Sequence, residues 1–240
     1  MIVCFCLLLF VGIIMCISCG KENEEDSFCE EQYNAAVRDA IFAETDEIQQ
    51  LVTIDENSDM VIWNDNKDKV LMVSWHSEAD DYPTSGMFVN EKSEIWVFTT
   101  CEMIAWYKNH ASDVTDWKQR FTQLLGLPIK NECSRFTAFW VNVKDLIRPA
   151  YQPDIRKQVS EGDLNGSSLV SHKTWFDQTI VGAYFGDYYP WTRLGYTYDW
   201  ADNGTEYGLS EFIILKNSSL EVAFSMTTDE FVKWLASETL

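Results

Sequence analysis

Apolar side chains recur at helical spacing in five stretches of this chain, and each stretch predicts a helix. The predicted helices cover Glu30–Ile41, Thr99–His110, Asp113–Leu125, His172–Phe185 and a closing segment that follows Thr227. Thr99 with Glu102, and Thr227 with Glu230, have the spacing of a capping box, whose two side chains satisfy free backbone N–H groups at the start of a helix. Gly126 is placed to end the third helix, because glycine readily adopts the left-handed conformation found there.

Apolar or alternating runs of strand length occupy much of the remaining chain. The expected strands are Leu51–Ile54, Met60–Trp63, Lys69–His76, Glu94–Thr99, Arg135–Val143, Leu194–Trp200, Ser210–Leu215 and Leu220–Met226. Lys69–His76 is apolar over most of its length, which is typical of a central strand buried on both faces. Residues 202–204 (Asp-Asn-Gly) predict a turn, and residues 217–219 are expected to join the last two strands as a hairpin.

Helices and strands mix in this pattern, with no internal repeat and no Pro- or Ser-rich linker. We therefore predict an α+β fold with a mainly antiparallel sheet and flanking helices. The length of the chain suits one domain, and residues 30–240 are assigned to it.

The start of the chain predicts export. Ile2–Ser18 carries no charge and is nearly all apolar. It is shorter than the roughly 20 residues of a membrane span but fits the apolar region of a signal peptide, although the usual basic start is missing. Residues 16–20 (Cys-Ile-Ser-Cys-Gly) then resemble a lipobox, with Cys16 in place of the usual leucine. We predict a signal peptide at residues 1–18 and a lipid with palmitate-like acyl chains on Cys19, which anchors the chain to a membrane.

A polar, acidic segment follows the anchor, and residues 19–29 are predicted to be a lipidated acidic tether. Lys21 followed by acidic residues resembles the surface-export signal of Bacteroidetes lipoproteins. Gly20, in the place of an aspartate, argues against retention in the inner membrane. The resemblance implies an outer-membrane lipoprotein that faces the cell surface, and a simple polar tether is the alternative.

Composition narrows the possible partners. The formal net charge is −20 at pH 7, and a surface this acidic repels phosphate backbones, so we expect no nucleic acid as a partner. Beyond the anchor, the remaining cysteines are Cys29, Cys101 and Cys133. Their odd number allows at most one internal disulfide, and whether one forms is left open. Their spacing fits no zinc motif.

Several stretches between about residue 35 and residue 235 resemble known sequences. They are Lys69–His76, Glu94–Thr99, Leu124–Pro128, Phe139–Pro149, Tyr189–Trp200 and Gly208–Phe212. They are similar to a family of uncharacterised bacterial lipoproteins that carry a domain of unknown function. The resemblance implies a shared domain and no activity, so no functional residue is carried over from it.

The densest chemical feature is an aromatic run in which eight of the seventeen residues of Tyr184–Trp200 are aromatic. Aromatic rings stack on the C–H faces of sugars, and charged groups between them bind hydroxyls. The predicted ligand contacts are Trp191, Arg193, Tyr196, Tyr198, Asp199 and Trp200. In a strand, Tyr196, Tyr198 and Trp200 share one face. The alternative is that this face is simply the core side of the sheet.

Catalytic motifs such as GxSxG, HExxH or a phosphate-binding glycine loop are missing from the sequence. We therefore favour a binding protein, with a glycan or a protein as ligand, and expect no cofactor. The alternative is a cell-envelope hydrolase. It would use Cys101, at a predicted helix start, with His76 or His110, or the carboxylates Glu206 and Glu211 as a pair.

Two smaller features complete the candidates. His76 with Asp80 and Asp81 suggests metal ligands, but this set suits no single metal well, and we predict no metal site. Arg148, which precedes Pro149, is interpreted as part of an ion pair or as a clamp on backbone carbonyl groups.

Overall fold

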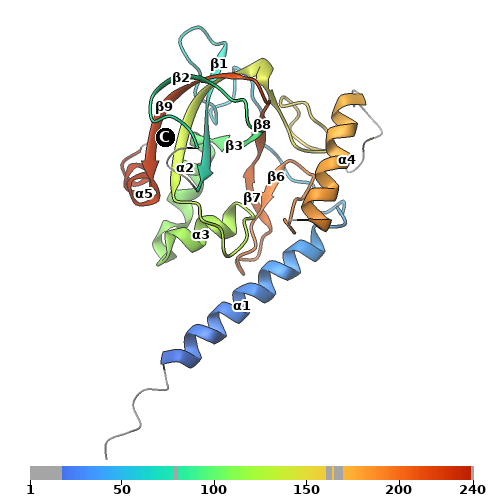
Figure 1. The fold of residues 1–240 in the computed structure, drawn as a ribbon, viewed down its shortest axis with the longest axis vertical. Helices are drawn as coiled ribbons and strands as arrows, with labels where there is room; N and C mark the ends of the chain where they lie inside the picture. Colours follow the sequence, from blue (N-terminus) through green and yellow to red (C-terminus); the bar gives the residue numbers. More distant parts are fainter. Residues whose placement is uncertain (1–17, 78–80, 161–163, 165–169, 187, 239–240) are drawn as a thin grey trace, which may run out of the picture.

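The computed structural model describes residues 18–77, 81–160, 164, 170–186 and 188–238. Apart from Ser18, the predicted signal peptide lies outside the described residues, as does Asp80. The described part of the chain forms a single α+β body with a seven-stranded antiparallel sheet and five α-helices (Figure 1). The predicted fold class is confirmed.

The main sheet has the order β2-β9-β4-β1-β3-β8-β5. Its strands are β1 (Lys69–His76), β2 (Gly86–Val89), β3 (Ile95–Thr99), β4 (Arg135–Asn142), β5 (Leu146–Ile147), β8 (Phe212–Ile214) and β9 (Ser219–Thr227). β1 lies at the centre of the order, and all of its residues except Lys69 are buried, which confirms the predicted central strand. β6 (Tyr196–Tyr198) and β7 (Tyr207–Ser210) form a separate two-stranded sheet.

Helices cover one face of the main sheet. α2 (Thr100–His110), α3 (Trp117–Leu124) and α5 (Thr228–Ser237) pack against a cluster that includes Leu71, Val73 and Trp75. Phe121 of α3 and Phe231 of α5 are fully buried there, and each such ring stabilises the fold by roughly 1.5–3 kcal/mol relative to an exposed one. The other face carries a second cluster, to which the segment between α1 and β1 contributes Ile54 and Val61.

Two helices lie away from this layer. α4 (Val170–Phe185) lies on the opposite side of the molecule from α5, and α1 (Ser18–Asp39) extends outward from the body (Figure 1). Near its end, α1 packs Tyr33, Ala36 and Val37 against Trp200. α1 takes in residues 19–29, so the acidic segment after Cys19 is helical here. Among the described residues, no helix combines the length and the apolar character that crossing a membrane requires.

Both predicted caps begin helices, and one of the two capping boxes is complete. At α5, Thr227 and Glu230 make both bonds of the box. At α2, the Thr99 hydroxyl accepts from the Glu102 N–H, but the Glu102 carboxylate accepts from Ser210 and Tyr207 instead. Glu102 therefore ties the start of α2 to β7. Short 3₁₀ helices follow at Ala111–Asp113 and Val143–Asp145.

Three strand predictions are wrong. Residues 210–215 and 220–226 do not pair as a hairpin, because β8 pairs with β3 and β5 while β9 pairs with β2 and β4. Leu51–Ile54 and Met60–Trp63 are not strands. Leu51 and Ile54 are buried but donate their N–H groups to Gln158 and Ile155 in a neighbouring loop. Burial alone thus produced the apolar pattern that we interpreted as a strand.

Candidate functional site

A cavity of about 500 Å³ opens beside the central strands. Its wall consists of the end of β1, the start of β3, residues 125–127, one side of α4 and part of the segment 189–198. Aromatic rings form much of this wall, among them Tyr82, Trp96, Tyr189 and Trp191. A concave, mainly apolar site of this size suits a small molecule.

The cavity forms where β1 and β3 separate. Their ladder ends at the pair Val73–Phe98, while β1 stays paired with β4 as far as His76 and β3 stays paired with β8 as far as Ile95. Each strand is therefore held by its outer neighbour, and the two diverge beyond Val73–Phe98. The residues past that pair in both strands line the cavity.

Helix α4 leaves one side of the cavity open through Gly182, which is among the lining residues. In the described structure, a Cβ atom built on Gly182 would meet no other part of the chain within 4 Å. The neighbouring Val181 is 60% exposed and does not line the cavity. A larger side chain at position 182 would therefore begin in free space, and because Gly182 lines the cavity we expect it to narrow the opening.

Glu211 places a buried carboxyl group at the cavity. It lies between β7 and β8, and its backbone N–H donates to Gly195 O at 3.0 Å. The residue is 5% exposed, and within the described part of the chain its Oε1 has no hydrogen-bond partner. Burial raises the pKa of Glu211 well above its ordinary value, and Arg148 and Trp191 oppose that rise.

Arg148 lies behind Glu211 and is fully buried. Its guanidinium donates to three backbone carbonyls, those of Val52 (2.7 Å), Gly195 (3.3 Å) and Ile155 (3.5 Å). The carbonyl clamp that we considered for Arg148 is therefore confirmed. Burial lowers the pKa of Arg148 to about 10, against the opposing charges of Glu102 and Glu211, so the side chain is a cation at neutral pH.

The six predicted ligand contacts divide between the cavity and the protein interior. Trp191, Tyr196 and Tyr198 line the cavity. All six are buried except Tyr198, which is half-buried. The Trp191 and Trp200 indoles donate to Pro149 O and Leu127 O, the Tyr196 hydroxyl to Glu47 O, and Arg193 to Ala40 O and Ile41 O. The hydrogen bonds that these residues make are within the chain, so the three that line the cavity offer a ligand mainly their aromatic surfaces.

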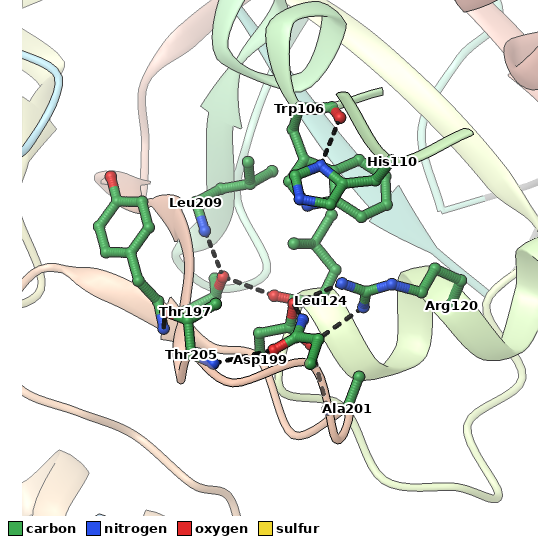
Figure 2. Close-up of polar contacts among 11 residues, drawn as sticks. Trp106, His110, Arg120, Leu124, Thr197, Asp199, Ala201, Thr205 and Leu209 are labelled. Atoms are coloured by element: carbon green, nitrogen blue, oxygen red, sulfur yellow. Dashed lines mark hydrogen bonds and ion pairs between the residues drawn. The ribbon is translucent and has the colours of Figure 1, made fainter. Parts of the chain in front are cut away.

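Asp199 is the sixth predicted contact, and its carboxylate is held inside the protein. Figure 2 shows the Arg120 guanidinium directed at it, with both terminal nitrogens donating and Nη1–Oδ1 at 2.9 Å. Nearby, the Thr197 hydroxyl donates to Leu124 O and accepts from Leu209 N–H (Figure 2). These bonds fix β6 and the following turn to α3, so Asp199 positions the segment that lines the cavity.

A cluster of three carboxylates lies beside a second hollow, and two of its members, Asp39 and Glu206, line that hollow. Asp39, Glu47 and Glu206 each bring one oxygen within 4.8 Å of the others, and the Tyr198 hydroxyl donates to Asp39 at 2.8 Å. Burial, the charge of Glu47 and a hydrogen bond with Asp39 raise the pKa of Glu206 to about 7. Three carboxylates alone are a small ligand set for Ca²⁺, which prefers six to eight oxygens, and the raised pKa of Glu206 favours a proton on this cluster near neutral pH.

Cys101 is not set up as a nucleophile. It is buried, and burial raises the pKa of its thiol, whereas a reactive cysteine needs an accessible thiolate. His76 Nε2 contacts Thr137 Oγ1 at 2.8 Å, and His110 Nδ1 donates to Trp106 O. Cys29, Cys101 and Cys133 are all free thiols, which answers the question of a disulfide among them.

The remaining candidates are dispersed. Glu206 lies in the acidic cluster and Glu211 at the cavity, and each lines a different hollow. His76 Nδ1 lies 3.6 Å from Asp81 Oδ2, and His76 also lines the cavity.

Sequence reasoning missed Trp96 and Gly182 as site residues. Trp96 gave no signal in the sequence, because its 42% exposure in an otherwise buried strand is visible only in the structure. Gly182 gave none. Comparison with protein-family models, curated proteins and solved structures finds no match to this chain.

Proposed function

We propose that this chain is an exported lipoprotein, anchored to the outer membrane through a lipid on Cys19 and facing the cell surface. Its α+β domain would bind a small ligand, with a glycan as our first candidate, in the cavity between β1, β3 and α4. The apolar leader and the lipobox resemblance around Cys19 support the anchor. The resemblance to the bacterial lipoprotein family stays a prediction and adds no activity.

The aromatic cavity is the observation that carries the binding role. Trp96 and Trp191 meet edge to face at 6.2 Å between ring centroids, and both line the cavity. Rings so arranged offer flat apolar surfaces to the C–H face of a sugar, while Glu94 and Glu211 supply polar groups at the same wall. This combination favours a small ligand over a flat protein interface.

The test blocks the cavity without disturbing the fold. Gly182→Leu fills open space in a helix, where leucine is favoured over glycine by close to 1 kcal/mol, so the variant should fold. We expect glycan-array signals of the wild-type chain to fall at least about tenfold in this variant. Val181→Leu, on the same helix but outside the cavity, is the matched control and should bind as the wild type does. If both variants bound glycans as well as the wild type does, the cavity would not be the binding site, and the ligand would bind at another surface.

A cell-envelope hydrolase is the second candidate, and the cluster of Asp39, Glu47 and Glu206 beside the second hollow favours it. The pKa of Glu206, raised to about 7, lies where a general acid works best. In this reading Glu206 protonates the leaving group of a cell-envelope glycan. Glu206→Gln should then lower hydrolysis of isolated envelope glycans at least about 100-fold, while Glu221→Gln on the surface should not. Undetectable hydrolysis by the wild-type chain would end this candidate.

A further inference from the structure

We propose that the ligand of the cavity carries an organic ammonium group that pairs with Glu211. This inference rests on the proposed function, because it names the ligand class of the same cavity. The candidate ligands are primary or substituted amines on an apolar or sugar body.

The buried charges around Glu211 are unbalanced. Arg148 is fully buried, and besides the exposed Asp154 its charge interacts with two carboxyl groups, those of the half-buried Glu102 and the buried Glu211. One guanidinium therefore faces two carboxyl groups, and it donates its own hydrogen bonds to backbone carbonyls. Buried charges need compensation. The set formed by Arg148, Glu102 and Glu211 is therefore balanced by one more positive charge or by one proton.

The two carboxyl groups differ in how they are satisfied. Glu102 accepts three hydrogen bonds, from Tyr207 O–H (2.8 Å), Ser210 N–H (3.0 Å) and Ser210 O–H (3.0 Å). Within the described residues, Glu211 Oε1 accepts none, and Glu211 is among the residues that line the cavity. Of the two residues, Glu211 alone lines the cavity, so its carboxyl is the one that lies next to a bound ligand. A ligand N–H group that carries a positive charge would donate the hydrogen bond that Oε1 lacks. It would also balance the negative charge that Arg148 alone does not neutralise.

The walls of the cavity favour the same ligand. A cation within about 6 Å of an aromatic centroid is attracted by the ring, and Trp96 and Trp191 both line the cavity. Glu94, the other acidic residue of the wall, adds a second negative charge. The net charge of −20 also raises the local concentration of cations around the protein. An anionic ligand would meet Glu94 and Glu211 together and is disfavoured.

The test compares two small ligands of one carbon skeleton, 2-phenylethylammonium and 2-phenylethanol, by isothermal titration calorimetry on the full chain in detergent micelles. A hydrogen bond between charged groups in such a site corresponds to roughly 10–100-fold in affinity. We expect the amine to bind at least about tenfold more tightly than the alcohol. Glu211→Gln, which keeps the shape of the side chain, should remove this preference. Glu221→Gln, which removes one surface charge beside Lys69, controls for net charge and should keep it.

The possible outcomes separate this inference from the proposed function. A preference for the amine that disappears in Glu211→Gln and persists in Glu221→Gln supports both. If amine and alcohol bind equally, and both are lost in Gly182→Leu, the cavity is a binding site but the pairing with Glu211 is overturned. If neither ligand binds at millimolar concentration, the pairing with Glu211 is overturned, while the cavity itself is judged by glycan binding in Gly182→Leu.

Discussion

The buried pair between Arg120 and Asp199 gives the sharpest stability prediction. The Asp199 side chain is 1% exposed and that of Arg120 is 12% exposed, and the carboxylate also accepts from Ala201 N–H and the Asn203 amide. Asp199→Ala leaves a nearly buried guanidinium without its partner, which typically costs 3–5 kcal/mol. Because Arg120 retains some solvent contact and lies over the Trp106 ring, we expect the lower end, about 3 kcal/mol. In a domain of this size this corresponds to a fall in Tm of roughly 6–12 °C.

Urea unfolding followed by tryptophan fluorescence measures this loss. Glu56→Ala is the control, because it breaks an ion pair with Lys67 whose side chains are 63% and 59% exposed, and such surface pairs contribute about 0–1 kcal/mol. The double variant Arg120→Met/Asp199→Leu should lose less than the sum of its single changes, since it leaves no unpaired charge. If Asp199→Ala cost no more than Glu56→Ala, the reasoning that this pair holds β6 to α3 would be refuted.

Three further outcomes follow from the packing and the titrating groups. Gly195→Ala should cost about 2–5 kcal/mol in urea unfolding, because φ is +92° and the new Cβ would lie 2.6 Å from Arg148 Cδ; Gly86→Ala, with φ +84° and nothing within 4 Å, should cost about 1–2 kcal/mol. The raised pKa of Glu206 means that the native state holds its proton more tightly than the unfolded chain. Its contribution to the free energy of unfolding is therefore complete below the ordinary glutamate pKa and is lost as pH rises through about 7. Glu206→Gln should flatten this part of the pH–stability curve, and an unchanged slope would contradict the assignment. Cys101 should be the last thiol alkylated by iodoacetamide in the native protein, as mass spectrometry of timed digests would detect, and rapid labelling would show that it is accessible.

Local patterns predicted elements well where one signal dominated. The continuous apolar run of Lys69–His76 correctly predicted the central strand, and the spacing of Thr227 and Glu230 correctly predicted a complete cap. Local patterns could not predict which strands pair, because the partner of a strand is set by contacts between residues that are distant in sequence. Residues 210–215 and 220–226 lie close together along the chain, yet their strands pair on different sides of β1.

The site was predictable only in part. Three of the residues predicted from the aromatic run, Trp191, Tyr196 and Tyr198, do line the cavity, and their role in binding stays a prediction. The aromatic run could not reveal that Arg193, Asp199 and Trp200 make their hydrogen bonds within the protein itself. The cavity exists because two strands diverge beside a helix that has a glycine at the facing position, and no local spacing encodes that arrangement.

The intact mass of the protein isolated from its own cells tests the proposed lipid attachment at Cys19 most directly. We expect a chain that begins at Cys19 and carries the mass of a diacylglycerol with additional acyl chains. A chain that retains residues 1–18 and carries no lipid would contradict it.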